Sequence, residues 1–129
     1  MPSAHYLILS FVLGWEVTAQ TSKPVRHAIL ERGWHNQGFQ PALGAAAACA
    51  KLLGFDRDQT RMTLGLAASM CAGFHINRGS DTKPFHAGNA ARSGRRTAGR
   101  GRRRPARTRP RRRRPGCHGS AVRPSRTGA

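Results

Sequence analysis

A histidine in a glycine-rich stretch is the residue of this chain best suited to proton transfer. His35 lies in residues 33–41, which contain two Gly, one Pro and several side-chain amides and keep neither a helical nor a strand period. Such a stretch is typical of a loop. Because an imidazole titrates near pH 6.5, His35 can take or give a proton at neutral pH. The residues alone leave open the alternative of an ordinary surface or packing histidine.

A lysine at a predicted helix start offers a complementary charge. Lys83 precedes Pro84, and proline is favoured in the first turn of a helix because its missing N–H is not needed there. A cation beside the free N–H groups of a helix N-terminus makes a natural carboxylate site. His86 lies one turn further on and can face the same anion, or it can pack or cap. Asn89 is either a ligand contact or a structural hydrogen-bonding group.

Other catalytic and metal-binding patterns are missing from the sequence. The three cysteines, Cys49, Cys71 and Cys117, are an odd number without C-x-x-C spacing, which indicates neither a disulfide framework nor a zinc site and fits a reducing compartment. Cys49 lies in an Ala run and is expected to be a small buried apolar residue. With no G-x-S-x-G elbow, P-loop or dinucleotide fingerprint, we expect no metal and no cofactor. The remaining histidines lack a suggestive spacing and are expected to be ordinary: His5, His27, His75 and His118.

Two helical segments surround the loop of His35. Residues 6–31 have apolar side chains at helical spacing and predict one helix, or two that are separated at Pro24. Residues 42–53 are rich in Ala, with a strong helix propensity, and Gly54 suits a helix C-terminus. Because small side chains let a neighbour approach closely, we expect this second helix to be buried inside a bundle.

Two further segments complete an all-α prediction. Asp56 and Gln59 have the spacing of a capping box and predict a helix that runs to about residue 72. Residues 83–92 have the pattern of a helix start. After Gly94 the apolar periodicity stops.

The charge also divides the chain at Gly94. The formal net charge is +18, but residues 1–94 contain 9 basic and 5 acidic residues, whereas residues 95–129 contain 14 Arg and no acid. The first part is long enough for one small domain. The second has Val122 as its only aliphatic residue larger than Ala and cannot build a core. We therefore predict a helical domain over residues 1–94 and a disordered Arg-rich tail over residues 95–129.

Two explanations of the tail stay open. As a polycation it would bind phosphate backbones, and the alternative function is therefore an unspecific nucleic-acid-binding protein. The tail has no aromatic side chain that could stack on bases. However, Arg, Gly, Pro and Ala, which have GC-rich codons, make up 27 of its 35 residues, and Lys is absent. A gene read out of frame gives this composition, and we favour that hypothesis.

The sequence predicts no membrane span. The longest apolar run, residues 6–15, is shorter than the roughly 18–20 residues that a bilayer requires and is interrupted by Ser10 and Gly14. A secretory signal is the weaker alternative, because residues 17–19 are similar to a cleavage site but the residues before the apolar run include no Lys or Arg. We expect a cytoplasmic protein with no membrane partner.

Three stretches of the sequence resemble the MmgE/PrpD family, which includes 2-methylcitrate dehydratase and cis-aconitate decarboxylase. Residues 12–17, Val-Leu-Gly-Trp-Glu-Val, resemble a family helix with a Gly-aromatic-Glu-Val pattern. Residues 33–35, Gly-Trp-His, followed by the Ala-rich residues 44–54, resemble the family's His loop and the helix after it. Residues 82–91, Thr-Lys-Pro-Phe-His-Ala-Gly-Asn-Ala-Ala, resemble the Lys-Pro-x-His-x-Gly segment, which is the most specific of the three.

The resemblance implies a lyase that needs no metal and acts on a small di- or tricarboxylate. Such an enzyme moves a proton next to a carboxylate, with loss of water or carbon dioxide. By the same resemblance, His35 and Lys83 are catalytic, and His86, Thr82 and Asn89 bind the substrate. The resemblance also implies a small polycarboxylate as partner and a homodimer.

The chain departs from the family pattern beside the histidine. Where the family has His-Pro-Thr, the chain has His35-Asn36-Gln37, so the backbone that directs the imidazole can differ. Earlier helices of the family and its second, α+β domain have no counterpart in the sequence. We therefore expect an interior fragment of the helical domain, inactive alone and with apolar faces exposed.

Overall fold

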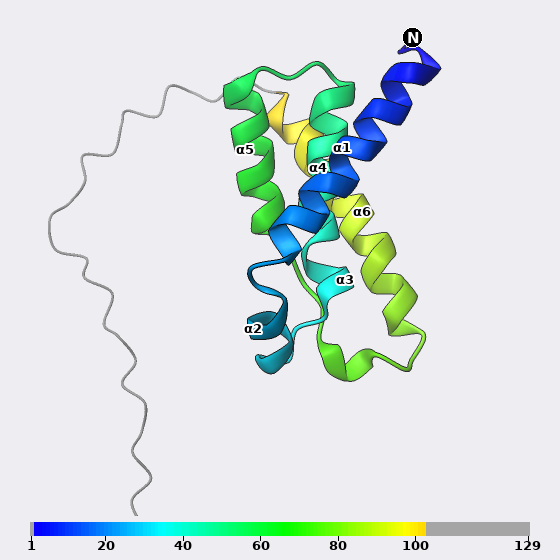
Figure 1. Cartoon of the computed structure of the whole chain (residues 1–129), viewed down its shortest axis with the longest axis vertical. Helices are drawn as coiled ribbons and strands as arrows, with labels where there is room; N and C mark the ends of the chain where they lie inside the picture. The colour runs from blue at the N-terminus through cyan, green and yellow to red at the C-terminus, as the bar shows by residue number, and fades with distance from the viewer. Residues whose placement is uncertain (1, 103–129) are drawn as a thin grey trace, which may run out of the picture.

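The structure, a computed structural model, describes residues 2–102 (Figure 1). The helices in this part of the chain are α1 (Ala4–Ser22), α2 (Arg26–Glu31), α3 (Asn36–Phe39), α4 (Pro41–Leu52), α5 (Arg57–Ala68), the 3-10 helix η1 (His75–Asn77) and α6 (Thr82–Gly101). Residues 2–102 contain no strand, and the one isolated bridge among them joins Trp34 to Phe74. The predicted all-α fold is confirmed over these residues.

Helix α4 is the centre of the bundle and contacts α1, α5 and α6 (Figure 1). Its small side chains are what allow three neighbours to pack on it. A Cβ on Gly44 would collide with the Thr18 side chain and with the carbonyl oxygen of Gly14, both on α1. The predicted buried position of this helix is therefore confirmed. Its buried residues are Ala42, Gly44, Ala46, Ala47 and Ala50.

Several helix ends fall where the sequence predicts them. The helical structure is interrupted at Pro24, between α1 and α2, and Pro41 is the first residue of α4. The capping box before α5 is complete, since the Gln59 N–H donates to Asp56 Oδ1 at 2.8 Å and the Asp56 N–H donates to Gln59 Oε1 at 3.1 Å. Two expectations were wrong in detail, because α5 ends at Ala68, earlier than predicted, and the predicted loop over residues 33–41 contains the single turn α3.

The last helix is longer than predicted, and the expectation that regular structure stops at Gly94 was wrong. Helix α6 continues to Gly101, because small residues beyond Gly94 recur at helical spacing and are buried. A Cβ on Gly94 would collide with Ala45 of α4. The buried residues of this stretch are Ser93, Gly94, Thr97, Ala98 and Gly101. The predicted disorder was therefore wrong for residues 95–101. Residues 103–129 lie outside the described residues, so their disorder, and the reading frame and nucleic-acid binding of the tail, stay predictions.

Helix α1 carries an apolar stripe that points away from the bundle. Only Ser10 and Gly14 of this helix are buried. The exposed stripe has spacing i, i+3, i+4 and i+7 and consists of Ile8, Phe11, Val12 and Trp15, with exposed fractions from 54% to 71%. Despite this apolar surface, none of the helices in residues 2–102 is long and apolar enough to cross a membrane.

Candidate functional site

Two loops at one end of the bundle are joined along their backbones and hold the histidine. Residues 33–38 run beside residues 72–75, and the rings of Trp34 and Phe74 stack with centroids 5.2 Å apart. Three backbone hydrogen bonds join the loops: His75 N–H to Gly33 O at 2.8 Å, His35 N–H to Gly73 O at 2.9 Å and Ala72 N–H to Gly38 O at 3.2 Å. The peptide group of His35 is therefore fixed from a segment that lies far away in the sequence.

Two glycines allow these loops to approach each other and α6. A Cβ on Gly38 would collide with the carbonyl oxygen of Ala72. Gly73 has φ of +142°, a backbone conformation that other residues rarely adopt, and a Cβ there would lie 3.2 Å from the His86 ring. The loop therefore fits closely over the imidazole that α6 presents.

The imidazole of His35 is buried against a second imidazole. Its exposed fraction is 4%, and its Nδ1 lies 3.0 Å from Nδ1 of His86, which is 6% exposed. Burial lowers the pKa of His35 below its ordinary value. Repulsion from His86, His75 and Lys83, when these groups carry a positive charge, lowers this pKa further, and a hydrogen bond with the Gln37 side chain acts in the opposite direction. The lowered pKa keeps His35 neutral at pH 7, which is the form a general base requires.

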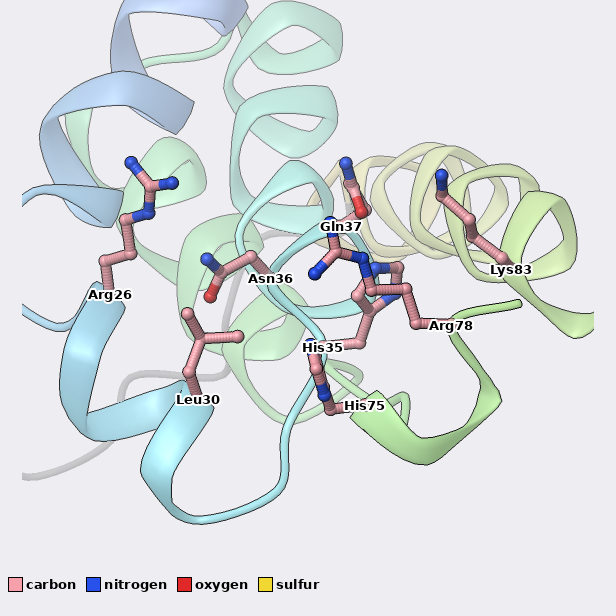
Figure 2. Close-up of a pocket in the computed structure, with 8 residues that line it drawn as sticks. All are labelled: Arg26, Leu30, His35, Asn36, Gln37, His75, Arg78 and Lys83. Carbon is pink, nitrogen blue, oxygen red and sulfur yellow. The ribbon is translucent and has the colours of Figure 1, made fainter. Parts of the chain in front are cut away.

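His35 lines a cationic pocket of about 160 Å³ (Figure 2). Arg26 and Arg78 enter it from α2 and from the turn after η1, and Lys83 enters from the first turn of α6. The pocket lining includes no acidic side chain. Such a pocket favours a ligand with more than one negative charge. The complete lining is Arg26, Leu30, His35, Asn36, Gln37, His75, Arg78 and Lys83.

Two amide side chains add neutral polar groups to the pocket. They are Asn36 and Gln37, the residues that depart from the family's His-Pro-Thr pattern. The buried Asn36 Oδ1 has no hydrogen-bond partner among the described residues. This oxygen is enclosed by protein atoms, so a ligand hydroxyl can donate to it only when the Asn36 side chain rotates toward the cavity.

The structure brings together some of the predicted site residues. His35 and Lys83 line the same pocket. His86 contacts His35 and is not part of the pocket lining, so it lies behind the imidazole that faces the pocket. Thr82 and Asn89 lie on α6 outside the lining, and their substrate-binding role stays a prediction. Because α6 begins at Thr82, Lys83 lies within its first turn, not before it as predicted.

Three lining residues with charged or titratable side chains were missed by sequence reasoning: Arg26, His75 and Arg78. Arg78 lies in a turn five positions before Lys83, and a second cation so near the predicted anion site was a usable signal. His75 was expected to be ordinary, yet its ring centroid is 6.2 Å from that of His35. Arg26 carries no sequence signal of its own. It lies beside the pocket because α2 leads directly into the loop of His35, where the Trp34 N–H donates to Ile29 O at 2.9 Å.

Metal and thiol chemistry find no support in the described residues. Within residues 2–102, no three His, Cys, Asp or Glu side chains are grouped closely enough to hold a metal ion together. Cys49 and Cys71 are free and half-buried, and burial raises the pKa of both thiols. Raised pKa values disfavour the reactive thiolate at both positions.

Comparisons with known proteins agree with the resemblance of the three stretches. The model of the MmgE/PrpD N-terminal domain matches residues 2–103. The cis-aconitate decarboxylases of Homo sapiens and Mus musculus are each 34% identical to the chain over 89 residues. The aligned part covers 68% of this chain and 18% of each relative, so the chain spans less than a fifth of their length. The chain belongs to the MmgE/PrpD family, and residues 2–103 correspond to its N-terminal domain.

Proposed function

We propose that this chain carries part of the active site of a lyase that acts on a small di- or tricarboxylate. In this proposal His35 moves the proton, while Lys83, with Arg78 and Arg26, holds the carboxylates. The observation that supports it best is a neutral, buried imidazole that lines a pocket with three permanent cations and no acidic side chain.

The chemistry follows from the charges of the lining. His35 takes a proton from the carbon next to a substrate carboxylate, and the electron pair of that C–H bond passes into the adjacent carboxylate as enolate-like charge. The side chains of Lys83 and Arg78 stabilise this charge. The charge then returns to form a C=C bond as the C–O bond breaks, and the hydroxyl group leaves as water with the proton that His35 had taken. In a decarboxylation, the C–C bond to the departing carboxylate breaks and its electron pair stays on carbon as carbon dioxide leaves. His35, which has first taken a proton from solvent, then delivers that proton to the carbon.

Two named compounds are the first candidates. The curated relatives are named for cis-aconitate, and 2-methylcitrate is the second candidate because the family includes its dehydratase. 2-Methylcitrate carries a hydroxyl group that can donate to Asn36 Oδ1 once this side chain rotates toward the cavity, whereas cis-aconitate carries no hydroxyl group. The free acceptor therefore favours a hydroxylated tricarboxylate in this chain.

A chimera tests the proposed activity directly. The aligned 89 residues replace their counterpart in human cis-aconitate decarboxylase, and loss of water or carbon dioxide is followed with both compounds. We expect turnover by the chimera, and its loss in the chimera that carries His35→Asn or Lys83→Met. A folded chimera whose turnover survives both substitutions would refute the proposed roles.

The chain by itself is proposed to be inactive. The pocket is open to solvent and the apolar stripe of α1 is uncovered, so binding without turnover is the expected behaviour. Incubation of the purified chain with cis-aconitate and with 2-methylcitrate tests this. Turnover by the isolated chain at a rate near that of an intact enzyme would contradict the fragment interpretation.

A further inference from the structure

The contact between His35 and His86 restricts where their protons lie. The two residues are 51 positions apart, and their Nδ1 atoms are 3.0 Å apart with the ring centroids at 5.2 Å. A neutral imidazole carries a proton on one of its two nitrogens. A hydrogen bond between the two Nδ1 atoms therefore requires that one ring donates and the other accepts. His86 thus determines which ring nitrogen of His35 is left without a proton.

The surroundings hold both rings in this arrangement. The backbone N–H of His35 donates to the Gly73 carbonyl oxygen at 2.9 Å, and Gly73 itself lies against the His86 ring. Only His35 of the two lines the pocket. His86 therefore faces His35 and not the pocket.

The charges of the pocket favour one of the two directions. Lys83, Arg78 and Arg26 line the pocket together with His35. The positive potential of these groups favours a lone pair over an N–H on the pocket side of the imidazole. We propose that His86 is a positioning residue, which accepts the Nδ1–H of His35 and so keeps His35 Nε2 unprotonated and ready to act as a base.

The hydrogen bond between His35 and His86 also stabilises the site after His35 has taken a proton. When Nε2 of His35 takes a proton, the ring becomes an imidazolium and its Nδ1–H still donates to His86. A charged donor makes this hydrogen bond stronger than in the neutral pair. His86 thereby fixes the ring before proton transfer and stabilises it afterwards, without contacting the substrate.

Nuclear magnetic resonance of the full chain with ¹⁵N-labelled histidine tests the proposal. Long-range ¹H–¹⁵N correlations, recorded above the pH at which the histidines titrate, report which nitrogen of each ring carries the proton. We expect His35 to be protonated on Nδ1 and bare on Nε2, with a ¹⁵N–¹⁵N coupling to His86 across the hydrogen bond. A wild-type His35 that is protonated on Nε2 would overturn the proposal.

Two variants separate positioning from packing. His86→Leu removes the acceptor, and His35 should then lose its fixed tautomer and show the mixture of an exposed histidine such as His27. His86→Asn keeps an acceptor near the position of Nδ1, and it should restore the Nδ1–H form of His35. An unchanged His35 tautomer in a folded His86→Leu variant would contradict the proposal. If the His86→Leu variant does not fold, the tautomers of His35 in the wild-type chain and in the His86→Asn variant decide whether His86 is a positioning residue.

The role of His35 Nε2 as a base rests on the proposed function, but the tautomer does not. A chain with the expected tautomer that binds no tricarboxylate would refute the proposed function alone. A chain that binds a tricarboxylate and has Nε2 protonated would refute the positioning role alone.

Discussion

Replacing Gly73 by alanine tests whether this glycine assembles the site. Its φ of +142° lies in a region that alanine adopts only with strain of about 1–3 kcal/mol. The new Cβ would also lie 3.2 Å from the His86 ring, so the ring or the loop must shift. We expect Gly73→Ala to lower the free energy of unfolding by about 2 kcal/mol. With a urea m-value of about 1–2 kcal/mol/M, this lowers the unfolding midpoint by about 1–2 M.

Urea unfolding followed by circular dichroism measures the effect, and a second glycine supplies the control. Gly65 lies on the exposed side of α5, where a Cβ would meet nothing within 4 Å. Gly65→Ala should therefore raise the stability by roughly 0.5–1 kcal/mol, because alanine is the better helix former. If both variants were equally stable, or if Gly73→Ala matched the wild type, the account of the two loops would be wrong.

The other predictions concern charge, pH, the amide and the apolar stripe. Arg78→Leu should weaken citrate binding about fivefold, since one charge-assisted contact contributes about 1 kcal/mol, and isothermal calorimetry checks this. The stability should fall as the pH decreases below about 6.5, because His35 has its ordinary pKa in the unfolded chain and a lowered pKa in the folded chain, so the unfolded chain binds protons more readily. Urea unfolding midpoints at several pH values should show this fall, and the substitution His35→Asn should reduce it. Citrate should bind more tightly than tricarballylate, which lacks the hydroxyl, and Asn36→Leu should remove the preference, as shift titrations would show. Phe11→Glu should reduce self-association in analytical ultracentrifugation, because Phe11 is 69% exposed in the apolar stripe of α1.

Local rules were enough to predict most helices. Asp56 and Gln59 fix the start of α5 by hydrogen bonds within one turn, and Pro41 fixes the start of α4. The end of α6 was missed because the periodic face beyond Gly94 is made of small residues, which packing against α4 and α5 buries. A search for large apolar side chains does not detect such a face.

The site was less predictable than the helices. His35 and Lys83 were found because imidazole and lysine are suited to proton transfer and anion binding, and because the surrounding stretches resemble a family. The distances that define the site depend on tertiary contacts. Arg26 lies beside the pocket through the fold of α2 onto the loop of His35, and His86 meets His35 where Gly73 leaves room for its ring. No spacing along the chain carries that information.

A residue-resolved titration with cis-aconitate tests the central claim, that the pocket of His35 and Lys83 binds a tricarboxylate. Site resolution is essential because residues 95–129 contain 14 Arg and attract any anion. The account predicts saturable amide shift changes at the pocket residues, which Lys83→Met removes and which acetate, with one charge, does not reproduce. Shift changes that are confined to the arginines of residues 95–129, or that survive Lys83→Met unaltered, would contradict the account.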